Sequence, residues 1–220
     1  ITIGKSVAKY TKSKDDIMYY AQELKENTYN LTRMNLVMRG IKPDNIFTRC
    51  GDTLEQDWPM YDDVTQEYNP LYLDAVVSNP PYSQRWDPKH KDTDPRYRYG
   101  IAPKGKADYA FLLHDLYHLK PDGIMTIVLP HGVLFRGDAL GGPDGQGEGE
   151  GKIRRNLIEN NNIEAIIGLP ANIFFGTGIP TIIMVLRQKR QESDVLFIDA
   201  SKGFTKVGKT NKLMASDIKR

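Results

Sequence analysis

A short apolar run, Leu71 to Ser78, ends directly at Asn79-Pro80-Pro81-Tyr82, and this junction constrains the fold more than any other feature of the chain. Apolar runs of this length are typical of central parallel strands in α/β proteins, which are buried on both faces. Ligand sites in such sheets lie at the carboxyl ends of the strands. We therefore expect a buried strand at 71–78 and functional side chains at 79–82, a segment that we call the NPPY motif.

The NPPY motif supplies what methylation of an exocyclic amine requires. The lone pair of adenine N6 or cytosine N4 is delocalised into the ring, so the nitrogen is a poor nucleophile. The side-chain carbonyl of Asn79 and the main-chain carbonyl of Pro80 can each accept one amino hydrogen and hold the nitrogen against a methyl donor. Pro80 and Pro81 fix the backbone, and Tyr82 can stack on a base flipped out of a duplex. These four residues predict the catalytic site of an amino-group methyltransferase.

A plain turn is the alternative for the same four residues, because Asn and Pro are both common where a strand ends. The tetrapeptide alone does not separate the two interpretations. The apolar strand in front of it favours catalysis, since the position and the chemistry then agree.

Strand and helix patterns alternate along the 220 residues, which are enough for one α/β domain with a real core. Helical spacing of apolar residues starts the chain at 1–12, a second helix ends at Gly40, a third covers 107–119, and a short one ends near Asn160. Strands are expected at 17–21, 46–49, 71–78, 124–129, 163–169, 181–186 and 195–199. This order predicts a doubly wound, mainly parallel sheet.

The composition excludes several classes of protein. Hydrophobic residues make up 40% of the chain and charged residues 26%, which is ordinary for a soluble globular protein. No run approaches the roughly 18 apolar residues of a membrane span, and no secretory leader is present, so we expect a cytoplasmic protein. Cys50 is the single cysteine and the four histidines show no metal-ligand spacing, so we expect neither a disulfide nor a metal.

A basic segment directly follows the NPPY motif, and we call residues 83–106 the basic loop. The net charge of the chain is only +2, which is too weak for a protein that holds DNA unaided. In this loop, however, seven basic residues face three aspartates, and Trp86, Tyr97 and Tyr99 are interleaved with them. This pattern suits a segment that contacts DNA phosphates through its cations and stacks bases on its aromatic rings. The candidate DNA-binding residues are Arg85, Lys89, Lys91, Arg96 and Arg98. A solvated, partly disordered loop is the alternative.

A glycine-rich segment spans Gly137 to Gly151. It lacks the Gly-Lys-Ser/Thr ending of a phosphate-binding loop and follows no strand-to-helix pattern of that type. We therefore predict a surface loop without a phosphate site.

Two acidic residues, Glu23 and Asp52, each follow a predicted strand, at the same edge of the sheet as Asn79. A carboxylate in this position commonly accepts the two vicinal hydroxyls of a ribose, and Glu23 is the better placed for that role. Asp52 could receive an adenine amino group. Each acid alone is equally compatible with a helix cap or a turn.

The pattern resembles the modification (methyltransferase) subunit of type I restriction-modification systems, which are N6-adenine DNA methyltransferases. Beyond the NPPY motif, the similar stretches cover essentially the whole chain; they are residues 28–35, 51–54, 106–111, 129–137 and 173–181. The resemblance implies the fold of S-adenosylmethionine-dependent methyltransferases. It also implies DNA as substrate, a specificity subunit that reads the sequence, and a restriction (nuclease-translocase) subunit as partners.

The resemblance assigns roles to individual residues. Glu23 matches the ribose-binding acid of the S-adenosylmethionine site, Asp52 with Thr53 matches the adenine-side segment, and residues 79–82 match the catalytic motif, with Asn79 beside the cofactor as well. The family's glycine-rich cofactor loop is expected just upstream of Ile1, so we expect a fragment without the first strand and without an upstream helical domain. Such a fragment should bind the cofactor weakly and methylate little.

Three other functions stay open. Glutamine N5-methylation of a protein poses the same nucleophilicity problem and uses the same motif, although the basic loop favours DNA. A non-catalytic scaffold that docks other subunits is a second possibility. Cytosine N4 is a third, although enzymes with that target more often carry Ser than Asn at the first position of the motif.

Overall fold

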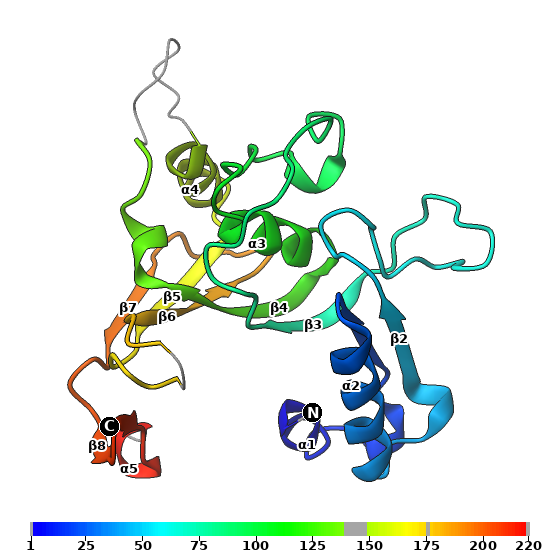
Figure 1. Cartoon of the computed structure of the whole chain (residues 1–220), viewed down its shortest axis with the longest axis horizontal. Helices are drawn as coiled ribbons and strands as arrows, with labels where there is room; N and C mark the ends of the chain where they lie inside the picture. Colours follow the sequence, from blue (N-terminus) through cyan, green and yellow to red (C-terminus); the bar gives the residue numbers. More distant parts are fainter. Residues whose placement is uncertain (1, 139–148, 175–176, 219–220) are drawn as a thin grey trace. The chain divides into compact units, whose positions relative to one another are not determined.

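The computed structural model describes residues 2–138, 149–174 and 177–218, which form two compact units, Ile1–Leu71 and Tyr72–Arg220 (Figure 1). Sequence patterns alone suggested one domain. Each unit has its own parallel strands.

The first unit is a two-stranded parallel sheet with helices. Its elements are α1 (Thr2–Val7), β1 (Tyr19–Glu23), α2 (Glu26–Met38) and β2 (Ile46–Cys50), with 3-10 turns at Lys14–Asp16 and Pro43–Asn45. β1 and β2 run parallel, with Glu23 opposite Cys50. Stacking of Tyr20 on Phe47, at 4.7 Å between ring centroids, joins the two strands. Helix α2 ends where Gly40 takes a φ of 73°, which glycine adopts without strain. The predicted strands and helix of this region are confirmed.

The second unit is a five-stranded sheet in the order β3-β4-β6-β5-β7. The strands are β3 (Leu73–Ser78), β4 (Leu119–Pro130), β5 (Ile163–Gly168), β6 (Thr181–Leu186) and β7 (Leu196–Asp199). β6 is antiparallel to both of its neighbours, while β3 is parallel to β4 and β5 is parallel to β7. The predicted mainly parallel α/β sheet is confirmed, with one reversed strand that the sequence patterns did not reveal.

Two helices cover one face of this sheet (Figure 1). Along the chain, α3 (Asp108–Tyr117) connects β3 to β4, and α4 (Gly149–Glu159) connects β4 to β5. Side chains alternate along β4, so that Met125, Ile127 and Leu129 are buried while the residues between them are less covered. The core forms where these residues meet the buried faces of the helices, among them Leu112, Leu116, Ile153 and Leu157. Transfer of each such side chain out of water contributes about 1.5–3 kcal/mol to the fold.

The expectation of a fully buried strand at 71–78 is wrong in part. Among the described strands β3 pairs only with β4, so it forms an edge of the five-stranded sheet, and the Val77 side chain is 52% exposed. An apolar run indicates that a strand can be buried, but it does not say how many strands lie beside it.

The predicted glycine-rich loop falls largely on residues 139–148, which lie outside the described residues. Its last three residues do not belong to a loop, because helix α4 already begins at Gly149, and Glu150 and Gly151 are buried in it. The polar tail contains the hairpin β8 (Thr205–Val207) and β9 (Thr210–Lys212) and helix α5 (Ala215–Ile218), which were not predicted. Within the part of the chain that the structure describes, no helix combines the length and the apolar character needed to cross a membrane.

Candidate functional site

The NPPY motif leaves the carboxyl end of β3, as predicted, and turns at Tyr82 and Ser83. Asn79 is exposed and Pro80 is buried. The hydroxyl of Tyr82 donates a hydrogen bond to Asn79 Oδ1 at 2.9 Å. A carbonyl oxygen has two lone pairs, so Asn79 can accept one further hydrogen, for example from an amine.

Burial raises the pKa of the Tyr82 hydroxyl, and the negative charge of Asp108 raises it further. Tyr82 therefore stays a neutral donor at physiological pH. The hydrogen bond to Asn79 orients the amide, because it fixes which of its two ends is the acceptor.

Helix α3 contacts the chain on both sides of the NPPY motif. The backbone N–H of Ser83 donates to Asp108 Oδ1 at 2.8 Å, and the hydroxyl of Ser78 donates to the carboxyl of Asp115. Burial raises the pKa of Asp115 to about 7, although the hydrogen bond from Ser78 and the nearby His118 both act to lower it. Sequence patterns gave no role to either acid.

Asp108 belongs to a buried charge network. Arg136 Nη2 lies 2.5 Å from Asp108 Oδ2 and 2.7 Å from Glu150 Oε1, and the side chains of the two acids are 0% and 3% exposed. Burial acts to lower the pKa of Arg136, but hydrogen bonds to Glu150 and Asp108 outweigh it and raise that pKa. Arg136 therefore remains charged. In the sequence, Asp108 and Arg136 stood out only because they lie in two stretches that resemble the family, 106–111 and 129–137. That resemblance did not indicate that the two residues are in contact.

Glu23 is the last residue of β1, as predicted, and is half-buried. The hydroxyl of Thr32, on α2, donates to Glu23 Oε1 at 3.3 Å. This contact holds the carboxylate while Oε2 has no hydrogen bond from another described residue. Glu23 is thus suited to accept hydroxyl groups from a ligand.

Asp52 lies just beyond β2, and its Oδ1 accepts the N–H of Leu54 at 2.9 Å. The turn that was weighed as an alternative is therefore present, and it uses one carboxylate oxygen. Thr53 lies inside this turn and is half-buried. Glu23 and Asp52 belong to the first unit and Asn79 to the second, so their alignment along one sheet edge stays a prediction.

The basic loop is folded rather than disordered. Trp86 Nε1 donates to the Pro103 carbonyl at 3.0 Å, and the rings of Trp86 and Tyr97 pack at 5.3 Å between centroids. Both rings are buried, so neither is available for base stacking, which corrects that expectation. Tyr99 is half-buried and lies under the guanidinium of Arg98, at 4.9 Å.

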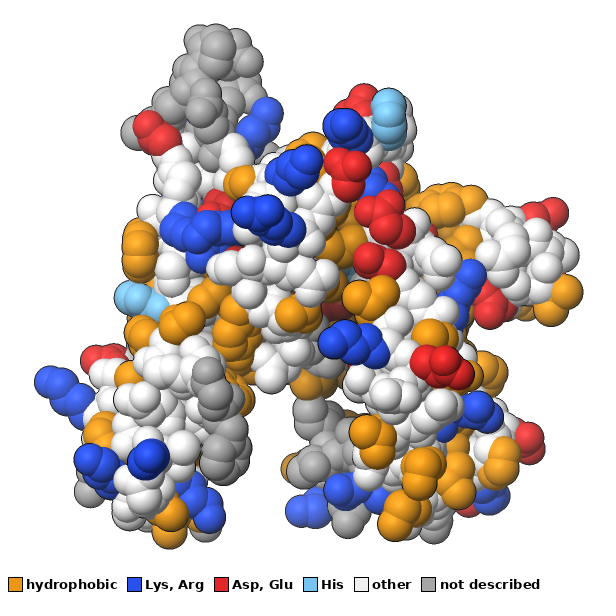
Figure 2. Space-filling view, viewed as in Figure 1, with side chains coloured by type: hydrophobic (Ala, Val, Ile, Leu, Met, Phe, Trp, Pro, Cys, Tyr) orange, Lys and Arg blue, Asp and Glu red, His pale blue; other side chains and the backbone are white. Residues whose placement is uncertain are grey.

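Arg96 does not suit the DNA-binding role predicted for it. Its guanidinium is bound by Asp94 at 2.7 Å and lies 3.1 Å from His114 Nδ1, and the residue is 3% exposed. A buried and paired guanidinium serves the loop, because a phosphate would have to displace Asp94. Arg85, Lys89 and Arg98 are exposed, while Lys91 is half-buried. Figure 2 shows basic and acidic side chains intermixed over this region.

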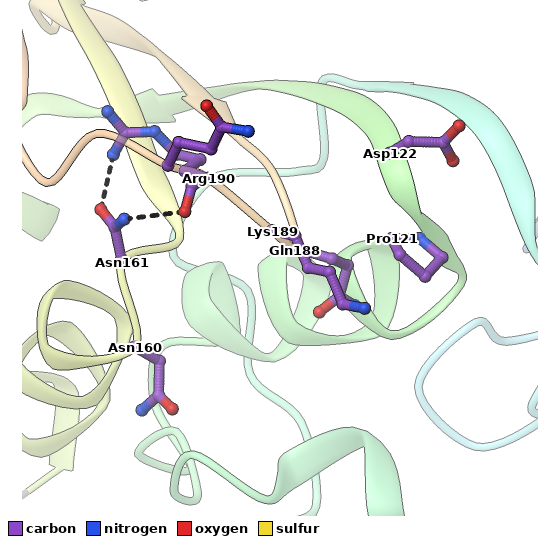
Figure 3. A pocket seen from close by; sticks show the side chains of 8 residues that line it. Pro121, Asp122, Asn160, Asn161, Gln188, Lys189 and Arg190 are labelled. Carbon is purple, nitrogen blue, oxygen red and sulfur yellow. Dashed lines mark hydrogen bonds between the residues drawn. The ribbon is translucent and has the colours of Figure 1, made fainter.

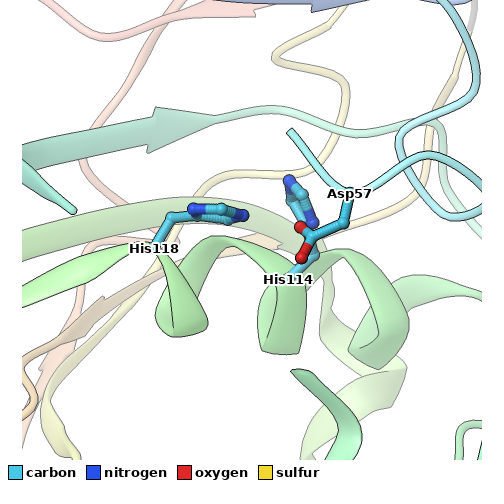
Figure 4. A group of neighbouring side chains, drawn as sticks. All are labelled: Asp57, His114 and His118. Carbon is cyan, nitrogen blue, oxygen red and sulfur yellow. The ribbon is translucent and has the colours of Figure 1, made fainter. Parts of the chain in front are cut away.

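His114 lies in the last turn of α3 and His118 follows the helix directly (Figure 4), although the four histidines look scattered in the sequence. Both are buried, with their rings 4.9 Å apart between centroids. His114 also contacts Arg96, and this contact links the basic loop to α3.

A hollow of about 620 Å³ lies elsewhere in the second unit and is lined by Pro121, Asp122, Asn160, Asn161 and residues 188–191 (Figure 3). Pro121 and Asp122 lie in the first part of β4, Asn160 and Asn161 precede β5, and residues 188–191 follow the reversed strand β6. The hollow therefore lies at the amino ends of β4 and β5, at the end of the sheet opposite to the NPPY motif. Arg190 there is bound to Asn161 Oδ1 at 3.0 Å. The hollow is therefore distinct from the catalytic candidate.

The chain is similar in sequence and fold to methylase subunits of type I restriction-modification systems. The chain is 37% identical over 214 residues to the methylase subunit of the type I restriction enzyme MpnII from Mycoplasma pneumoniae, covering 93% of the chain and 37% of that protein. It is 45% identical, with a TM-score of 0.85, to the crystal structure of the type I restriction-modification system methyltransferase subunit from Streptococcus thermophilus, covering 97% of the chain and 43% of that one.

The fold is shared more widely. A Listeria monocytogenes protein described as a putative class I S-adenosylmethionine-dependent methyltransferase matches with a TM-score of 0.62 at 16% identity, over 90% of the chain and 53% of that protein. The chain spans less than half the length of the curated relatives it matches. The N-6 DNA Methylase family matches residues 1–220, and the chain belongs to that family.

Proposed function

We propose that this chain is the catalytic part of a type I restriction-modification methylase subunit that transfers a methyl group from S-adenosylmethionine to N6 of a flipped adenine in DNA. One observation carries the proposal: in a chain of the N-6 DNA methylase family, the NPPY motif leaves the carboxyl end of β3 with Asn79 exposed. A DNA substrate fits a cytoplasmic location.

The residues present fit the cofactor. Glu23, held by Thr32, would accept the ribose hydroxyls, and Asp52 with Thr53 would lie beside the adenine ring. When bound, S-adenosylmethionine supplies an electrophilic methyl group on sulfur. We further propose that residues outside this chain complete the cofactor site and form an upstream helical domain, because the matched relatives are more than twice as long.

The chain's own residues hold and orient the target amine. Asn79 Oδ1 and the carbonyl of Pro80 would each accept one N6 hydrogen, which directs the nitrogen lone pair out of the ring plane. The ring of Tyr82 would stack on the base, with its hydroxyl bound to Asn79. After transfer, the nitrogen loses a proton and becomes neutral again.

Contacts with DNA phosphates would come from the exposed cations of the basic loop. We expect the combined change of Arg85, Lys89 and Arg98 to glutamine to flatten the plot of log Kd against log salt by about 0.9 for each phosphate that is no longer neutralised. Fluorescence anisotropy with duplex DNA, on the assembled methylase, measures the slope. Glutamine at Lys202, Lys206 and Lys212, which are exposed in the C-terminal part, is the charge-matched control. Equal slopes for the two triple variants would remove the basic loop from the interface.

The sequence that is methylated would be chosen by a specificity subunit, and a restriction subunit would join the same complex. The direct experiment is transfer of a labelled methyl group from S-adenosylmethionine to duplex DNA by the methylase with and without its specificity subunit. Label on DNA only in the complete assembly is the expected result. Label on a protein glutamine instead would favour the alternative substrate, and absence of transfer by the complete assembly would favour a scaffold.

A further inference from the structure

Ser83, directly after the NPPY motif, is held in a backbone conformation that its own side chain disfavours. Its φ is 51°, in the left-handed region, where a residue with a Cβ costs about 1–2 kcal/mol. Such a conformation persists only where surrounding contacts determine it. Asp108 supplies such contacts: the Ser83 N–H donates to its Oδ1 at 2.8 Å, and the Ser83 hydroxyl lies 3.5 Å from its Oδ2.

Asp108 is built to be a fixed acceptor. It is the first residue of α3, where the helix dipole favours a carboxylate, and it is fully buried. Its Oδ2 is bound by Arg136, and Arg136 is fixed in turn by Nε and Nη2 hydrogen bonds to Glu150, both at 2.7 Å. A rotation of the Asp108 carboxylate would break both contacts at once, so its position is locked.

A second arginine closes the network from α4. Arg154 Nη1 donates to the carbonyls of Val133 and Arg136, at 3.0 and 2.9 Å, and the Tyr109 hydroxyl donates to the same Val133 carbonyl at 2.9 Å. The segment after β4 that carries Arg136 is therefore attached to both α3 and α4. Because Arg136 is held in this segment, it fixes the Asp108 carboxylate, and the carboxylate in turn fixes the Ser83 N–H.

We propose that Asp108 is a positioning residue for methyl transfer, which acts through the Ser83 N–H to set the direction of the NPPY motif and is held in place by Arg136 and Glu150. The inference rests on the proposed function. Its physical basis is that a displacement of about 1 Å in a reacting group can lower a rate about 100-fold. The Asp108 charge also lies close enough to Tyr82 to raise the pKa of that hydroxyl.

The test compares Asp108→Ala and Asp108→Asn in the assembled methylase. Asp108→Ala removes the acceptor, so kcat should fall about 100-fold, while the Kd values for S-adenosylmethionine and DNA stay within about threefold. Asp108→Asn keeps an oxygen for the Ser83 N–H and should recover kcat to within about tenfold of wild type. Asp122→Ala, at an exposed acid on the opposite edge of the sheet, is the control and should retain full activity.

Two results would overturn the proposal: an unchanged kcat in folded Asp108→Ala, or parallel losses of kcat, both affinities and melting temperature, which indicate a general structural role. If Asp108→Ala does not fold, Glu150→Gln decides, because it leaves the contact with Ser83 but loosens Arg136. We expect about a tenfold loss in kcat with unchanged Kd values for S-adenosylmethionine and DNA. An unchanged kcat would reject the claim that Arg136 and Glu150 hold Asp108 in place for methyl transfer.

A readout that does not depend on activity separates this inference from the proposed function. Hydrogen exchange of the Ser83 amide, measured by NMR on this chain, should be slow in wild type and at least tenfold faster in Asp108→Ala. Equal exchange rates would show that Asp108 does not hold Ser83, whether or not the assembled enzyme methylates DNA. Slow exchange in a wild-type enzyme that transfers no methyl group would instead reject only the proposed function.

Discussion

Replacement of Asn79 by alanine is expected to lower methyl transfer by the assembled enzyme about 100- to 1,000-fold. Asn79 is exposed just beyond β3, and among the described residues its Oδ1 accepts a hydrogen bond only from the Tyr82 hydroxyl. A second lone pair is therefore left for a target amine. Removal of one such preorganised polar group commonly costs that factor in kcat. Single-turnover transfer of labelled methyl to DNA measures it.

Asparagine at another exposed position provides the control for this variant. Asn160 lies just beyond α4, at the sheet edge opposite to the NPPY motif, so Asn160→Ala should transfer at the wild-type rate. In Asn79→Ala, the Kd for S-adenosylmethionine should stay within about threefold, because the deleted acceptor serves chiefly the amine. Activity retained by Asn79→Ala would make the motif a structural turn, the other interpretation of the same four residues.

The second large effect is on stability and its dependence on pH. Burial raises the pKa of Asp115 to about 7 in the folded chain, whereas an unfolded Asp titrates near 4. Between pH 4 and pH 7 the unfolded state therefore releases a proton that the folded state keeps. The contribution of Asp115 to stability is consequently full below pH 4, is lost as pH rises to 7, and is constant above.

Asp115→Asn removes this titration and keeps an oxygen that can accept the Ser78 hydroxyl. We expect the variant to gain stability relative to wild type between pH 5 and pH 8, by a few kcal/mol in total, since one pKa unit corresponds to about 1.4 kcal/mol. Urea unfolding at several pH values, followed by probes in the second unit, measures the difference. If the difference in unfolding free energy between Asp115→Asn and wild type does not change with pH, the raised pKa of Asp115 is contradicted.

Asp199 is the matched acid for this experiment. Hydrogen bonds from Ser201 lower the pKa of Asp199. The pKa of Asp199 is therefore shifted in the opposite direction to that of Asp115. Carboxyl ¹³C NMR on the wild-type chain should therefore show one aspartate that titrates near pH 7 and is lost in Asp115→Asn. In Asp199→Asn that resonance should persist.

Local patterns predicted much of the fold. The strands at 46–49 and 181–186 and the helix that ends at Gly40 follow from apolar spacing and from a glycine at positive φ, which are both local properties. Strand direction is not local. The reversal of β6 depends on its pairing with β4 and β5, and nothing in its own six residues specifies this.

The candidate site divides in the same way. The positions of Asn79 and Glu23 at strand ends were predicted correctly, because such a position is a property of sequence order, while their roles stay predictions. The burial of Arg96 was not predicted, because it is set by Asp94, His114 and the packing of Trp86 on Tyr97. The charge network of Asp108 was not predicted, because Arg136, which binds Asp108, and Glu150, which binds Arg136, lie 28 and 42 residues away along the chain. Charges in sequence do not reveal which are buried together.

The central claim is that the NPPY motif presents an adenine amine to the methyl donor. Mass spectrometry of nucleosides from DNA treated with the assembled methylase and deuterated-methyl S-adenosylmethionine tests it most directly. The account predicts labelled N6-methyldeoxyadenosine, which is absent when the methylase carries Asn79→Ala. Labelled N4-methyldeoxycytidine, or label found only on protein, would contradict it.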